Sequence, residues 1–439
     1  MLILQNRTLV QIVASCCLMF LVAPISASEE TTDVFEPLYS GTATQAVGIL
    51  QARVAAGAGD AEQFALGIAQ TCSAIEHMTA SFNRYGLNSK MTDNLRMLGM
   101  PTVVVKNPAE DMIDAHQFRK VLDRFYQDIN TAQQTLEAIE PDDNLKIVFD
   151  ITRVRLDYNG DGEAGPDEAL GRLMQRVQQM QRDQRAEMMR SMGYDHLVDE
   201  VPEPEEVQPF LIALDAGDVY WLRGYCHVLM GVADFILAHD TDEIFNHTAH
   251  LFFGRVDTPY KILSEGQQES DDWTSQILDA VAFIHLIKLD VVEPQRMTDS
   301  LAHLRQVSVL SRQSWEAILS ETDNDREWIP GPTQESVLGS ALQLDQDRLD
   351  TWMLFLDEYD AIFAGKKLIP FWRGDKSHNM GVNLAKVFED PQTFDLILWI
   401  QGSAAIPYLE QGDFTTPEFW RQLQRAFRGD FMSFAVIVN

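Results

Sequence analysis

The stretch "EQFALGIAQTCSAIEHMTASFNRYG", from Glu62 to Gly86, decides the fold class. Its apolar side chains recur at three- to four-residue spacing, which places them along one face of a helix. Glycine commonly follows the last turn of a helix, and Gly86 stands where the pattern stops. The predicted buried stripe consists of Phe64, Ile68, Cys72, Ile75 and Phe82.

The same spacing recurs along most of the chain. We find no convincing set of segments that alternate between apolar and polar residues, as half-buried strands do, and no repeat of fixed length. Hydrophobic residues make up 46% of the 439 positions, which is enough for a large core. We therefore expect an all-α, multi-helix globular protein. Further helices are predicted at 109–138, 144–156, 166–190, 216–239, 271–290, 297–321 and 346–364.

The composition changes most sharply at "DEVPEPEEVQP", residues 199–209, which contains three prolines and five acidic residues. Proline fixes its own φ and keeps the preceding residue out of the helical region. This predicts an extended acidic linker between an N-terminal helical domain, 28–198, and a C-terminal helical domain, 210–439. A long acidic loop within one domain would give the same pattern, and both interpretations remain open.

The first 27 residues have the order of a secretory signal peptide. Arg7 precedes an apolar run from Leu9 to Ala23, and small residues follow at Ser26 and Ala27. The run is too short for a confident membrane anchor. We expect cleavage near Ala27, export to the periplasm or the exterior, and no integral membrane span afterwards. The motif "VASC", residues 13–16, leaves a lipoprotein-type anchor as an alternative.

The charge of the chain excludes some partners. Residues 1–27 contain one basic and no acidic residue, so the remaining chain has 33 basic and 66 acidic side chains, a net charge of −33. Such a surface repels nucleic acid and anionic membranes, and neither is expected as a partner. The acids are spread along the chain and do not form a tail.

The most specific motif is "DYNGDGEAGPDE", from Asp157 to Glu168. Calcium is a hard cation that takes six to eight oxygen ligands. Side-chain oxygens occupy the first, third, fifth and twelfth positions of the motif, and Gly162 occupies the sixth. This pattern of ligands and a turn glycine predicts calcium binding.

The motif closely resembles the calcium loop of the EF-hand family, and the resemblance covers only the loop and part of its flanks. It implies side-chain ligation by the first, third and fifth residues, a backbone carbonyl ligand at the seventh position and bidentate closure at the twelfth. It also implies a helix entering through "NLKIVFDITRVRL", residues 144–156, and a second helix starting at Pro166. The implied ligands are Asp157, Asn159, Asp161, Glu163 and Glu168.

Because EF-hands usually pair, "DNDREWIPGPTQE", residues 323–335, is the nearest candidate for a second cation site. Its acids Asp323, Asp325 and Glu327 alternate as the first three ligands would. Trp328 replaces the turn glycine, and the next acid, Glu335, comes one residue late. These acids form either an irregular cation site or helix caps.

A third candidate lies in "EIFNHTAHLFF", residues 243–253. Glu243, His247 and His250 fall at i, i+4 and i+7, so one helical face would present a carboxylate and two imidazoles. That set is half of a transition-metal site. Polar clustering on an exposed helix face explains the same spacing.

Two cysteines, Cys72 and Cys226, remain beyond the predicted signal peptide. An exported protein could join them by a disulfide, or they could be two separately buried thiols. So few cysteines argue against a disulfide scaffold and against a cysteine-based zinc site.

Together these features predict an exported helical protein that binds calcium in a structural role. One alternative is a metal-dependent hydrolase that uses Glu243, His247 and His250. Another is a periplasmic or extracellular binding module, with the aromatics of "WIP", 328–330, and "FWR", 371–373, lining a groove. No nucleophile elbow, phosphate loop or dinucleotide motif is present, so no catalytic residue is assigned.

Overall fold

The computed structural model describes residues 33–87, 107, 109–141, 144–191, 206–263, 273–342, 344–373, 379–429 and 431–439. Within these ranges the protein is mostly helical and its strands are short, which confirms the helical part of the expected fold. No helix in the same ranges is long and apolar enough to cross a membrane. The predicted signal peptide, 1–27, and residues 199–205 of the predicted linker lie outside the described residues.

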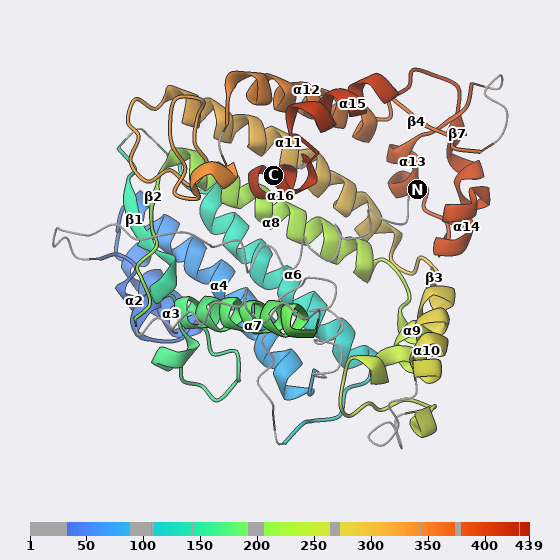
Figure 1. Cartoon of the computed structure of the whole chain (residues 1–439), viewed down its shortest axis with the longest axis horizontal. Coiled ribbons are helices and arrows are strands. Elements are labelled where there is room, and N and C mark those ends of the chain that lie inside the picture. The colour runs from blue at the N-terminus through green and yellow to red at the C-terminus, as the bar shows by residue number, and fades with distance from the viewer. Residues whose placement is uncertain are drawn as a thin grey trace.

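Long helices pack against one another as a series of neighbours through the middle of the molecule (Figure 1). The helix predicted from the first stretch of sequence is the second member of this series and contacts the helices on both sides of it. In order, the series is α3 (Ala43–Ala55), α4 (Asp60–Arg84), α6 (Ala115–Glu137), α8 (Ala216–Leu237), α11 (Pro294–Ser320) and α12 (Gln346–Phe363).

Several of these helices begin at residues that satisfy the free N–H groups of the first turn. Asp114 caps α6 in a reciprocal capping box with Gln117. Asp215 caps α8 by accepting a hydrogen bond from the Gly217 N–H. Pro294 is the first residue of α11, where its missing N–H costs nothing.

A single large core holds the helical series together. It contains Phe35, Ile129, Met230, Trp352 and Val438, all at most 2% exposed. These residues come from both sides of the 199–209 segment. The two predicted halves therefore share one core, as expected if the acidic segment is a loop within one domain.

The structure corrects the helix predicted at 144–156. This segment forms strand β1 (Ile147–Asp150), a 3₁₀ turn (Ile151–Arg153) and an extended run into the loop. β1 pairs antiparallel with β2 (Leu211–Leu214), at one end of the molecule (Figure 1). β-Branched and aromatic residues at 147–149 favour a strand. Phe149 is buried and Val148 is 43% exposed, which is the alternation of a strand with one face on the core.

Other predicted boundaries also move. The helix predicted at 109–138 begins only at Ala115. The helix predicted at 166–190 becomes a 3₁₀ turn (Pro166–Glu168) followed by α7 (Leu170–Ser191). The helix predicted at 271–290 is α10 (Trp273–Leu286), and strand β3 (Lys288–Leu289) follows it.

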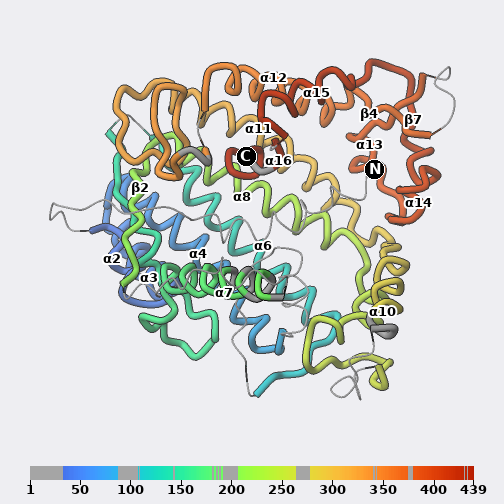
Figure 2. Tube along the Cα trace, in the orientation of Figure 1, coloured from blue at the N-terminus to red at the C-terminus, as the bar shows by residue number. Residues whose placement is uncertain are grey.

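Short elements fill the remaining described chain, and Figure 2 traces its path through the molecule. β3 pairs with β6 (Phe394–Asp395), and β5 (Gly381–Val382) lies between β4 (Ile369–Pro370) and β7 (Leu409–Glu410). The additional helices are α2 (Glu36–Ser40), α9 (Asp242–Thr248), α13 (Leu384–Glu389), α14 (Leu396–Gln401), α15 (Pro417–Ala426) and α16 (Phe431–Val438).

Candidate functional site

The loop 157–168 curls around the carboxylate of its first residue. The Asp157 carboxylate accepts hydrogen bonds from the backbone N–H groups of Gly160 at 2.7 Å, Asp161 at 3.1 Å and Gly162 at 2.8 Å. The Asn159 side-chain oxygen accepts from the Asp161 N–H at 2.8 Å. These bonds hold the first half of the loop in a tight coil around the Asp157 carboxylate.

The last residue of the loop closes onto this coil. One oxygen of Glu168 accepts a hydrogen bond from the Asn159 side-chain amide at 2.8 Å, and the other accepts from the Gly165 N–H at 2.9 Å. Asp157 and Glu168 are both 8% exposed, whereas Asp161 and Glu163 are exposed. The loop therefore brings Asn159 and Glu168, its third and twelfth positions, into contact near Asp157.

Two glycines allow the coil to form. Gly160 has φ +78° and Gly162 has φ +92°, both in the left-handed region that residues with a Cβ rarely adopt. Gly162 is the sixth position of the loop, where the calcium-loop pattern requires a sharp turn.

The segments around the loop differ from the expected pair of helices. An antiparallel bridge joins Arg155 to Ala169, and the Leu170 N–H donates to the Val154 carbonyl at 2.8 Å. The loop thus rises from a short two-stranded stem, and only its exit leads into a long helix, α7. A helix on the entering side was predicted and is wrong.

A buried carboxylate of helix α4 anchors the loop to the helical core. Glu76 is 4% exposed. One of its oxygens accepts from the N–H groups of Asp157 and Ala43, each at 2.9 Å, and the other accepts from the Thr44 N–H at 3.1 Å. Glu76 therefore ties the start of the loop and the start of α3 to the same turn of α4.

Negative charge accumulates at this position. The pKa of Glu168 lies above its usual range, chiefly because the carboxyl is buried, and also because Asp157, Asp161 and Glu76 are close to it. Hydrogen bonds from backbone N–H groups offset only part of that cost. A cation in the loop would remove the remaining repulsion.

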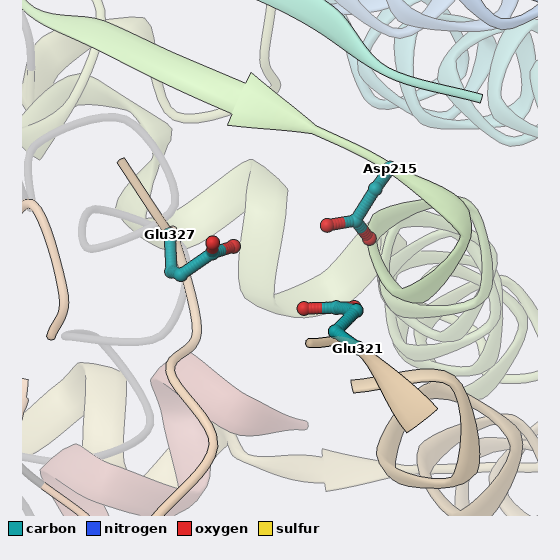
Figure 3. Close-up of side chains that lie close together, drawn as sticks. All are labelled: Asp215, Glu321 and Glu327. Carbon is teal, nitrogen blue, oxygen red and sulfur yellow. The ribbon is translucent and has the colours of Figure 1, made fainter. Parts of the chain in front are cut away.

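The three acids of the second predicted cation site, Asp323, Asp325 and Glu327, do not lie together in the structure. Asp323 and Asp325 both form ion pairs with Lys146. Glu327 instead lies with Asp215 and Glu321, and one oxygen from each of these three carboxylates lies within 4.8 Å of the others. Figure 3 shows the three side chains pointing toward one another.

Burial determines the protonation of this carboxylate cluster, which we define as Asp215, Glu321 and Glu327. It raises the pKa of Glu321 to about 8 and raises the pKa of the other two carboxyls. Burial also raises the pKa of Asp218, a neighbour on α8, well above its usual range. One oxygen of Glu321 is buried without a hydrogen-bond donor among the described residues. Glu321 therefore holds a proton near neutral pH when no cation compensates the cluster.

Sequence reasoning missed Asp215 and Glu321. The local signal at Asp215 indicates only a helix cap, which it is, and Glu321 simply follows α11. The packing of α8 against α11 brings them together, supported by a 2.9 Å hydrogen bond from the Ser314 hydroxyl to the Gly217 carbonyl.

The third candidate set is not brought together. Glu243 is exposed on the short helix α9, and the His247 ring stacks on Tyr260 with 4.0 Å between ring centroids. His250 lies beyond the end of α9 in a 3₁₀ turn, buried, with Nε2 3.7 Å from a carboxylate oxygen of Asp279. Of the residues that the structure describes, only the carboxylate cluster offers three converging ligands.

The aromatic and cysteine predictions have separate outcomes. Trp328 is 5% exposed inside the main core, whereas Trp372 is 46% exposed, so the aromatics of the two segments do not line one groove. Cys72 and Cys226 are not joined by a disulfide, in agreement with the interpretation as separate thiols.

Beside the loop anchor lies a hydroxyl–imidazole–carboxylate series that the sequence did not reveal. The Thr44 hydroxyl is 3.0 Å from His77 Nε2, and His77 Nδ1 is 2.8 Å from a carboxylate oxygen of Asp128. Nucleophilic triads use this order. Here, however, Glu76 lies 2.8 Å from the hydroxyl and also accepts hydrogen bonds from the Ala43 and Thr44 N–H groups, so these two backbone donors are not free to bind a developing oxyanion. The hydrogen bonds of the series tie the start of α3 to α4 and α6.

No protein-family model matches the chain, and no curated protein or solved structure is significantly similar to it. Any functional conclusion must therefore come from the geometry and chemistry of the sites.

Proposed function

We propose that this is an exported calcium-binding protein whose loop 157–168 holds one calcium ion in a structural role. The observation that carries the proposal is the closure of Glu168 onto Asn159, beside the coil that forms around the Asp157 carboxylate, which brings the two ends of the loop together. The left-handed turn at Gly162 supports it.

The proposed ligands are the side-chain oxygens of Asp157, Asn159 and Asp161, the backbone carbonyl of Glu163 and both oxygens of Glu168. Calcium prefers such all-oxygen sets and tolerates their irregular geometry. Magnesium should substitute poorly, because it requires a smaller and more regular octahedron. On binding, calcium would replace the Asn159 amide as the partner of the Glu168 carboxylate.

The proposed structural role of calcium rests on the hydrogen bonds that Glu76 makes to the loop and to α3. Glu76 links the loop to α4 and α3, and the exit of the loop leads into α7, so an ion in the loop would connect three helices. An ion that binds only the folded state adds RT ln(1 + [L]/Kd), about 2.7 kcal/mol at a hundredfold excess over Kd.

An exported protein would meet the calcium concentration that this loop needs. A single loop without a paired partner is expected at the weak end of the known range, with Kd on the order of 10⁻⁴ to 10⁻³ M, which is a range of extracellular modules. The proposal therefore requires removal of residues 1–27 in the native cell. Sequencing the N-terminus of the native protein tests this step, with Ser28 expected and an intact Met1 against it.

Calcium binding is tested by calorimetry and by thermal melts in calcium and in chelator. Glu168→Gln removes a charged bidentate ligand, and Glu163→Gln removes the same charge from a side chain that is not a proposed ligand. We expect one calcium per chain for the wild type and for Glu163→Gln, with a melting point several degrees higher in calcium. Glu168→Gln should lose most of both effects. The absence of binding heat at millimolar calcium, together with equal melts, would overturn the proposal.

Neither alternative function gains support from the described residues. Glu243, His247 and His250 do not converge, and the two aromatic segments do not share a groove. Metal analysis of the purified protein separates the classes, because stoichiometric zinc, iron or manganese would favour the hydrolase over the calcium protein.

A further inference from the structure

A cleft of about 410 Å³ lies beside the stem of loop 157–168. Its walls come from α2, the 3₁₀ turn after β1, the loop exit and the first turn of α7. Three of its lining side chains are the arginines Arg153, Arg155 and Arg172. This is an unusual concentration of positive charge in a chain with 34 basic and 66 acidic residues.

The three arginines differ in how their charges are compensated. Arg153 forms ion pairs with Asp33 at 3.3 Å and Glu36 at 2.9 Å, and it lies over the ring of Tyr39. In the described ranges, no carboxylate lies within ion-pair distance of Arg155 or Arg172, although both are half-buried. Within the part of the chain that the structure describes, the Arg172 guanidinium donates to a neutral acceptor, the Gln175 amide oxygen, at 3.1 Å.

The two acidic residues that line the cleft, Glu36 and Asp150, interact with partners other than Arg155 and Arg172. Glu36 pairs with Arg153. One oxygen of Asp150 accepts three hydrogen bonds, from the Thr152 N–H at 3.1 Å, the Thr152 hydroxyl at 2.6 Å and the Phe210 N–H at 3.2 Å. Among the described residues, the two guanidinium groups of Arg155 and Arg172 therefore have no negative partner at the cleft.

We propose that this cleft binds a small organic molecule through an oxyanion, a carboxylate or a phosphate, held by Arg155 and Arg172. The planar guanidinium group matches both oxyanions, because it can donate two parallel hydrogen bonds. The volume falls within the range of small-molecule sites, about 300–1,000 Å³. Pro166, Val207 and Pro209 provide an apolar rim for the carbon part of the ligand.

This inference does not depend on calcium, although the two sites share the stem of the loop. Arg155 forms the bridge to Ala169, and Ala169 also lines the cleft. Binding is therefore measured both in calcium and in chelator. Oxyanion binding in chelator, in a protein that shows no calcium heat, would leave this inference standing while the proposed function failed.

The test uses calorimetry of the full chain with three probes that share a ring: phenyl phosphate, benzoate and the neutral benzamide. We expect at least one of the two anions to bind and benzamide not to bind, with sodium chloride at equal ionic strength as the salt control. Stronger binding of phenyl phosphate identifies a phosphate ligand, and stronger binding of benzoate identifies a carboxylate.

Single substitutions test which residues bind the anion. Arg155→Gln and Arg172→Gln should each weaken binding of the preferred anion by about tenfold or more, the effect of losing a charge-assisted hydrogen bond. Arg155→Lys keeps the positive charge but cannot donate two parallel hydrogen bonds to the anion. It should therefore weaken anion binding less than Arg155→Gln does. Arg190→Gln, an exposed position on α7 outside the cleft, makes the same charge change and should bind as the wild type does.

Three results would overturn the inference: no anion binds, benzamide binds equally well, or Arg190→Gln weakens binding as much as Arg155→Gln and Arg172→Gln. Melting curves without ligand confirm that each variant is folded. If one arginine variant is unfolded, the other together with Arg155→Lys still decides the outcome.

Discussion

The carboxylate of Glu76 on helix α4 accepts a hydrogen bond from the backbone N–H of Asp157 at 2.9 Å, across 81 positions of sequence. Asp157 is the first residue of the proposed calcium loop, and its backbone position is therefore set by a helix of the core. The same carboxylate holds the first turn of α3. The loop is thus part of the helical packing and not a free surface turn.

Replacement of Glu76 should weaken both stability and calcium binding. Gln at this position offers one neutral acceptor where the carboxylate offers two charged oxygens. We expect Glu76→Gln to lose about 2 kcal/mol of unfolding free energy, as for other buried charge-assisted hydrogen bonds. Urea denaturation measures this loss, and Glu62→Gln in the first turn of the same helix is the control. Equal stability of the two variants would contradict the anchoring role.

Gly162 provides a purely conformational test. Its φ of +92° strains any residue with a Cβ, yet nothing lies within 4 Å of the position that a Cβ would take. We expect Gly162→Ala to lose about 1 kcal/mol and to bind calcium more weakly, because the left-handed conformation costs roughly 1–2 kcal/mol. Gly165→Ala is the matched control in the same loop, since Gly165 has φ −72°. Similar denaturation midpoints for the two variants would argue against a required turn at Gly162.

Calcium affinity should fall as the pH is lowered. Burial raises the pKa of Glu168, so protons compete with calcium for this carboxylate already above the usual range of a glutamate, about 4.3. Calorimetry between pH 7 and pH 4 should show weaker binding at the acid end of this range. Glu163→Gln should follow the wild type at each pH. An affinity that stays constant down to pH 4 would show that Glu168 is not a ligand.

The carboxylate cluster predicts a loss of stability as the pH rises from about 4.3 to about 8. The pKa of Glu321 is about 8 in the folded protein and about 4.3 in an unfolded chain, so the folded state binds more protons between these values. Stability must then fall as the pH rises through this window. Glu321→Gln should match the wild type near pH 5 and melt higher than the wild type at pH 9.

Two comparisons control this prediction. Glu316→Gln, an exposed change on α11, should keep the pH profile of the wild type. If calcium raised the melting point of Glu168→Gln at pH 9, a cation and not protons would compensate the cluster.

The helical part of the fold, which depends on local sequence, was predicted well. Helix α4 follows from the periodic stripe around Ile68. The closure of loop 157–168 involves residues of one short motif, and calcium binding by that motif stays a prediction. Strand β1 was predicted as a helix, because four residues are too few for alternation to stand out and its partner strand, β2, lies far along the chain.

Sites assembled by packing could not be predicted. Asp215 and Glu327 meet only when the loop after α11 reaches the start of α8. The oxyanion cleft depends on the stem that places Arg155 beside the first turn of α7. Neither arrangement leaves a recognisable spacing in the sequence.

The long sequence separation between Glu76 and Asp157 also bears on the rates of folding. Contacts between distant segments tend to form late, because the entropy of closing the intervening chain must be lost first. An ion bound in loop 157–168 would then stabilise the native state more than the transition state. We therefore expect calcium chiefly to slow unfolding, with little change in the folding rate, so that the calcium concentration around the protein sets its lifetime in the native state.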